Sequence, residues 1–119
     1  DLRVLFDGDR ATLGERLARY VIQKKPVDDG YDPLVALLRS TSCEAPARML
    51  REVLREGFVA PLAALMDGPH AVQRAELVGS TLLGLLVHRT LIGGASPDDG
   101  ERTIALVAPT LQTYIDGTG

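Results

Sequence analysis

Apolar positions recur along most of this chain at the three- and four-residue spacing that is typical of an amphipathic α-helix. The first such pattern follows Asp9, a residue type that caps helix N-termini, and it precedes Pro26, which cannot continue a helix. A second, shorter pattern starts at Asp32 and Pro33. We find no alternation of period two of useful length, so the sequence predicts an all-α fold, a helical bundle.

A third pattern opens at Thr41-Ser42-Cys43-Glu44, which has the spacing of a capping box. It continues to Pro61, where we expect a kink or a restart because proline removes a backbone donor and clashes with the preceding turn. A long helix is predicted from Pro69 to Ile92. The last helix starts at Ser96-Pro97, and Pro109 inside it should bend it.

The long helix is apolar on most of its circumference, with only a narrow polar sector. Such a helix must be buried on most sides, and in so small a domain a second subunit is the simplest cover. Gly79, Ser80 and Gly84 should allow close helix approach. We therefore expect the last two helices to form a dimeric four-helix interface, although a monomer with a central helix remains the alternative. The predicted interface residues are Leu77, Thr81, Gly84, His88, Leu91, Ile104, Val107, Ala108, Leu111 and Tyr114.

Composition narrows the class of protein. The 119 residues fit a single domain spanning 1–119, and the net charge of −3 is unlike that of a domain that binds nucleic acid. The longest apolar run, Leu77 to Val87, is too short to cross a membrane, so we expect no membrane partner. A single cysteine, Cys43, excludes an internal disulfide and suits a cytoplasmic location.

Candidate chemistry is sparse. Cys43 lies near a predicted helix N-terminus, but His70 and His88 are distant in sequence, so we predict no catalytic residues. The histidine and cysteine spacings fit no zinc site, and we predict no metal and no cofactor. Arginines recur on one face of the third helix beside glutamates, which favours a solvated, salt-bridged face over an anion site. These arginines are Arg48, Arg51 and Arg55.

Apolar cavities commonly form between the helices of a bundle, and inward-facing residues could line one here. A buried arginine at the end of the long helix also needs a partner: a carboxylate of its own chain, one across the dimer, or a polar effector. We favour a structural partner for it, and plain core packing for the apolar residues taken one by one. The pocket candidates are Tyr20, Met49, Val53, Phe58, Leu62, Met66, Leu82, Leu85 and Arg89.

Several stretches resemble the TetR (tetracycline repressor-like) family of transcriptional regulators, in its C-terminal domain. The resemblance covers most of the chain and rests on the order and spacing of helical patterns. Those patterns are Leu13-Gly14-Glu15-Arg16-Leu17-Ala18, Pro33-Leu34-Val35-Ala36-Leu37-Leu38-Arg39, Arg74-Ala75-Glu76-Leu77-Val78-Gly79, Leu83-Gly84-Leu85, Arg89 and Ala108-Pro109-Thr110-Leu111-Gln112-Thr113-Tyr114.

This resemblance implies a homodimer that binds a small apolar or amphipathic effector inside the bundle and releases operator DNA when it does so. No helix-turn-helix precedes Asp1 in this sequence. We therefore expect operator binding only through an N-terminal domain that this chain lacks. The alternative is a stand-alone helical dimerisation or adaptor module without a small-molecule ligand.

Overall fold

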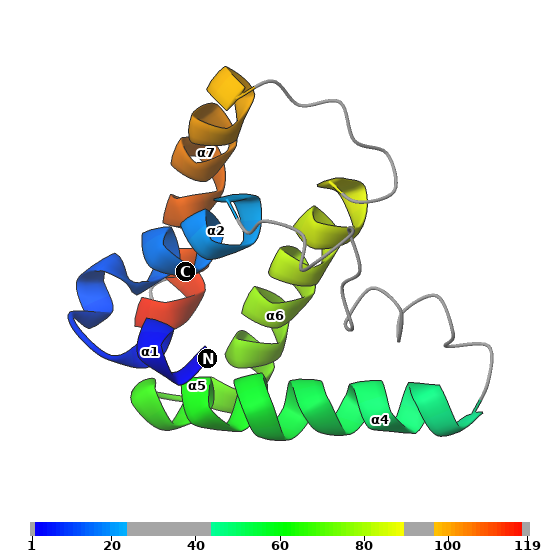
Figure 1. Ribbon diagram of the computed structural model, residues 1–119. Coiled ribbons are helices and arrows are strands. Elements are labelled where there is room, and N and C mark those ends of the chain that lie inside the picture. Colours follow the sequence, from blue (N-terminus) through cyan, green and yellow to red (C-terminus); the bar gives the residue numbers. More distant parts are fainter. Residues whose placement is uncertain (1, 24–43, 90–96, 118–119) are drawn as a thin grey trace.

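The computed structural model describes residues 2–23, 44–89 and 97–117, and within these ranges it contains helices and no strand (Figure 1). The all-α prediction is confirmed. In chain order the elements are α1 (Leu2–Phe6), η1 (Arg10–Thr12), α2 (Leu13–Gln23), α4 (Glu44–Leu54), η2 (Arg55–Val59), α5 (Ala60–Leu65), α6 (Ala71–Val87) and α7 (Pro97–Asp116).

Three helix starts show how well local signals worked. Asp9 accepts a hydrogen bond from the backbone N–H of Ala11 at 2.9 Å, as its capping role predicts. Pro97 is the first residue of α7. The long helix α6 begins at Ala71 rather than Pro69, because His70 has a left-handed backbone conformation with a φ of 62°. The predicted helix after Asp32 and the predicted end at Ile92 lie outside the described residues.

Pro61 does not break the third helix. Helices α4 and α5 form one continuous rod, joined by the five-residue π-helical turn η2 (Figure 1). In that turn the N–H of Ala60 donates to the carbonyl of Arg55, five residues earlier. An α-helix would aim the proline ring at the carbonyl of Gly57, and a wider turn relieves this clash. The expected interruption is therefore absorbed as a local change of helix type.

Helices α2 and α7 pack side by side although they lie near opposite ends of the sequence (Figure 1). Gly14 makes this close approach possible, because a Cβ atom there would lie 2.9 Å from the carbonyl oxygen of Ala108 and 3.0 Å from the backbone nitrogen of Gln112. The N–H of Gly14 has no partner within its own helix, and it donates to the side-chain oxygen of Gln112 at 2.9 Å. Gln112 in turn donates to the carbonyl of Arg10 at 2.8 Å.

Arg16 fixes the segment that leads into α2, from the end of α1 to η1. The guanidinium of Arg16 donates to the carbonyl of Leu5 and to those of Asp7 and Asp9, the latter two at 2.6 Å each. These carbonyls lie at the end of α1 and in the link to η1, and that of Asp9 also accepts from the N–H of Thr12 in η1 at 3.2 Å. Arg16 therefore holds α1 against α2.

The core lies between α2, α5, α6 and α7 and is made of aliphatic side chains, one phenylalanine and one methionine. Among the described side chains, no polar or charged one is buried. No helix in the described parts of the chain is long and apolar enough to cross a membrane. The core residues are Leu13, Leu17, Ala18, Phe58, Leu62, Met66, Ala75, Val78, Leu82, Ile104, Leu111 and Ile115.

Candidate functional site

The outward face of α6 is largely open. Leu77 is 47% exposed, although it is a large apolar residue in the middle of the protein's most apolar helix. Gly84 and His88 are exposed, and Thr81 is half-buried. Thr81 lies one helical turn from Leu77 and one from Gly84. A Cβ atom at Gly84 would meet nothing within 4 Å. These four predicted interface residues thus form one continuous row, which we call the α6 row.

The last helix contributes differently from the prediction. Ile104 and Leu111 are 2% and 0% exposed and lie in the protomer's own core, so they offer no surface to a second chain. Val107, Ala108 and Tyr114 are half-buried. The helical periodicity of the sequence places these residues on one apolar stripe of the last helix. It does not indicate that α2 of the same chain already covers the centre of that stripe. Leu91, the remaining interface candidate, lies outside the described residues.

The sequence analysis did not predict the most exposed large apolar residue of α7. Leu106 is 73% exposed, the highest value among the large apolar side chains that the structure describes. The helical wheel did carry a signal for it, because Leu106 lies on the side of α7 opposite Ile104 and has no apolar neighbours on that side. An isolated leucine of this kind was not distinguishable from an ordinary surface residue.

Arg74 fixes α6 against the C-terminal end of α7. Its guanidinium donates to the carbonyls of Tyr114 at 2.9 Å and Ile115 at 3.3 Å, which are orphaned at the end of that helix. The same side chain donates to the carbonyl of Pro69 at 3.0 Å and to that of Asp67. Arg74 thus connects the turn before α6 with the end of α7. Sequence analysis noted this arginine only as part of a pattern.

The predicted apolar pocket residues lie in three different environments. Phe58, Leu62, Met66 and Leu82 are part of the buried core. Tyr20 and Leu85 are half-buried, and Leu85 packs against that core. Met49 and Val53, by contrast, are 54% and 49% exposed on α4.

This division matters because a pocket needs residues that face a shared space. The core members pack on one another, while Met49 and Val53 lie one helical turn apart and form an open apolar strip on α4. The strip, rather than the core set, is the part of the prediction that retains surface for a ligand.

Arg89, the last pocket candidate, has a structural contact. Its guanidinium donates to the backbone carbonyl of Val21 at 2.7 Å, in the last turn of α2. The C-terminal carbonyls of a helix lack helical partners and favour positive charge. This contact is a structural one, made to a helix terminus within the same chain.

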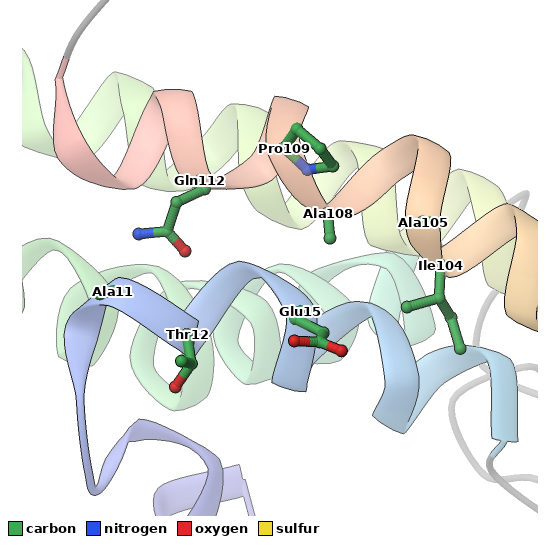
Figure 2. Close-up of a pocket in the computed structure, with 8 residues that line it drawn as sticks. All are labelled: Ala11, Thr12, Glu15, Ile104, Ala105, Ala108, Pro109 and Gln112. Carbon is green, nitrogen blue, oxygen red and sulfur yellow. The ribbon is translucent and has the colours of Figure 1, made fainter.

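A groove of about 290 Å³ lies between η1, α2 and α7. Figure 2 shows Ala108 and Gln112 of α7 facing the ribbons of η1 and α2 across it. Its polar groups are already engaged, because Gln112 bonds to Gly14 and Arg10, and Glu15 pairs with Arg19 at 3.1 Å. The lining residues are Ala11, Thr12, Glu15, Ile104, Ala105, Ala108, Pro109 and Gln112, of which Ile104 and Ala108 were predicted interface residues.

Charged side chains pair at the protein surface. Arg19 pairs with Glu101 at 2.7 Å, and the hydrogen bond from Arg19 lowers the pKa of the Glu101 carboxyl. Arg10 pairs with Asp67 at 2.9 Å, and this bond raises the pKa of Arg10. Both pairs are exposed, so their role is to align helices rather than to tune a reactive group. Within the described ranges, no group of three histidine, cysteine, aspartate or glutamate side chains lies close enough to hold a metal ion.

Comparison with known proteins adds one finding. A family model described as "Tetracyclin repressor-like, C-terminal domain" matches residues 11–115. A search of curated proteins found no match. The matched range includes both helices of the α2–α7 pair and all of α6. Because this range covers most of the chain, the protein belongs to the tetracyclin repressor-like C-terminal domain family of transcription regulators.

Proposed function

We propose that this chain is the effector-sensing and dimerisation domain of a TetR-like transcriptional regulator. The family membership supports a regulatory role, and the exposed apolar residues Leu77 and Leu106 on α6 and α7 carry the dimerisation part. Operator DNA is bound by a helix-turn-helix domain of the parent protein, and effector binding changes the spacing of two such domains by a population shift.

Dimerisation is supported by the shape of the α6 row. Gly84 has no neighbour within 4 Å and presents no side chain, so a second helix can come close at this point. Leu77 supplies apolar surface on one side of it, and Leu106 is a further exposed apolar residue, on α7. Burying large exposed apolar side chains against an identical copy satisfies both chains through the same contacts.

Replacing Leu106 with glutamate is expected to dissociate the dimer. A two-fold interface contains this residue twice, so the change buries two unpaired carboxylates. We expect the dimer dissociation constant to rise about 100-fold or more, on the scale of an interface hot spot. Sedimentation velocity between nanomolar and micromolar concentration measures it.

Val4→Glu is the matched control, because Val4 is 69% exposed but belongs to α1 rather than to α6 or α7. It is expected to leave dissociation unchanged. A wild-type chain that is monomeric at micromolar concentration, or equal effects of the two substitutions, would remove the dimerisation proposal.

Effector binding is tested by thermal shift with a panel of apolar and amphipathic compounds. A compound present at 100 times its dissociation constant stabilises the fold by about 2.7 kcal/mol and raises the melting temperature. Val53→Glu should abolish the shift, because it places a charge on the open strip of α4, whereas Val4→Glu should retain it. If the panel yields no stabilising compound while the chain is dimeric, the dimerisation or adaptor module becomes the better proposal.

A further inference from the structure

Phe58 lies where three helical segments meet. It is the one buried residue of the π-helical turn η2. Its ring lies 5.6 Å from the ring of Phe6 on α1, centroid to centroid, with the ring planes tilted by 55°. On its other side it contacts α6 at Gly79, where an added Cβ atom would lie 3.3 Å from the ring.

Gly79 therefore has a different role from the one expected. The sequence suggested that this glycine lets a second helix approach, whereas in the structure the missing side chain makes room for Phe58 of the same chain. The two atoms that come within 4 Å of a Cβ at this position both belong to the Phe58 ring. No atom of Phe6 comes close to that Cβ position. Among Gly79, Phe58 and Phe6, the link between α6 and Phe6 therefore runs through the Phe58 ring.

The π-helical turn gives Phe58 a second property. Such a turn contains one residue more than an α-helical turn, and it is one of the places where a helix kinks and its two halves shift relative to each other. A shift would rotate the buried ring relative to α1 and α6. Gly57, its neighbour in the turn, meets nothing within 4 Å and so does not oppose such a change.

We propose that Phe58 is a coupling residue that transmits displacements of α6 and of the α4–α5 rod to α1. This inference rests on the proposed function in one respect only: effector binding or dimerisation would be what moves these helices. Helix α4 carries the strip of Met49 and Val53, and α6 carries the row that includes Leu77. Phe58 is a contact through which movement of either helix can reach Phe6. The coupling itself needs neither an effector nor a dimer, because it is a property of packed side chains.

The composition of the chain allows a direct test. Phe6 and Phe58 are its two phenylalanines, so labelling with 4-fluorophenylalanine gives one fluorine resonance for each ring. Phe6→Leu assigns the two resonances with little disturbance, because Phe6 is half-buried. Gly79→Ala then serves as the perturbation, since its new Cβ must displace the Phe58 ring by a few tenths of an ångström.

We expect Gly79→Ala to shift the Phe6 resonance by more than its linewidth, although Gly79 and Phe6 do not touch. In a Phe58→Leu background the same substitution should leave the Phe6 resonance in place. Gly57→Ala is the matched control, because it adds the same methyl group beside Phe58 without meeting any neighbour, and it should not move Phe6. If Phe58→Leu impairs folding, Phe58→Met provides the same background.

Two results would overturn the coupling role. One is a Phe6 resonance that Gly79→Ala does not move. The other is a shift that persists without the Phe58 ring. Sedimentation of the same labelled samples separates this outcome from the proposed function. A monomer with the expected shift keeps the coupling and removes the dimer, whereas a dimer without the shift does the reverse.

Discussion

Gly14→Ala is expected to lower the free energy of unfolding by about 1–3 kcal/mol, the usual cost of forcing atoms into a packed interface. The new methyl group would lie 2.9 Å from the carbonyl oxygen of Ala108 and 3.0 Å from the nitrogen of Gln112, which are backbone atoms of α7. Backbone atoms cannot rotate away, so α2 and α7 must separate. The separation also stretches the bond from Gly14 to the Gln112 side chain. Urea denaturation followed by circular dichroism measures the loss.

The control for this experiment is Gly57→Ala, at a helical glycine without neighbours within 4 Å. Alanine there reduces the entropy of the unfolded chain and should stabilise the fold by about 0.4–1 kcal/mol. The two glycine-to-alanine changes are therefore expected to have opposite signs. Equal effects would mean that the close approach of α2 and α7 does not contribute to stability.

Arg74→Met is expected to cost about 3 kcal/mol, because hydrogen bonds from a charged donor are worth about 1.5–3 kcal/mol each and several are lost together. Methionine keeps the apolar stem and removes the contacts with the carbonyls of Pro69, Tyr114 and Asp67. The C-terminal carbonyls of α7 then lack their protein partner. Urea denaturation at a fixed protein concentration gives the free energy.

Arg102→Met is the comparison, because Arg102 makes a surface pair with Asp99 at 3.5 Å on its own helix. Exposed pairs of this kind contribute about 0–1 kcal/mol, so little change is expected. The role assigned to Arg74 fails if its removal costs no more than the removal of Arg102.

Helix boundaries were the most predictable part of this protein, because they depend on neighbours in the sequence. Asp9 and Pro97 each act at short range and were placed correctly. Pro61 was expected to kink its helix or to restart it, but one π-helical turn relieves the clash of the proline ring and the helix continues. Sequence alone does not indicate this solution, since it depends on Phe58 finding space beside Gly79. The short helix α1 was not expected at all.

The candidate surfaces were less predictable, because a helical wheel gives the face of a helix but not its partner. The apolar stripe of α7 was real, yet Ile104 and Leu111 on it are covered by the protomer itself. The exposed side is instead occupied by Leu106. The arginine contacts followed the same rule. Arg74 and Arg89 both bond to backbone carbonyls of other helices, and a sequence gives no sign of which carbonyls are close.

The pairing of α2 with α7 has a consequence for synthesis. Gly14 bonds to a residue that the ribosome adds 98 positions later. Until α7 leaves the exit tunnel, the apolar face of α2, with Leu13 and Leu17, lacks the helix that packs beside it. The nascent chain therefore carries an exposed apolar face on α2 until α7 has emerged, which makes it a substrate for chaperones that bind such surfaces. The emergence of α7, rather than that of the helices before it, sets the moment at which this bundle closes.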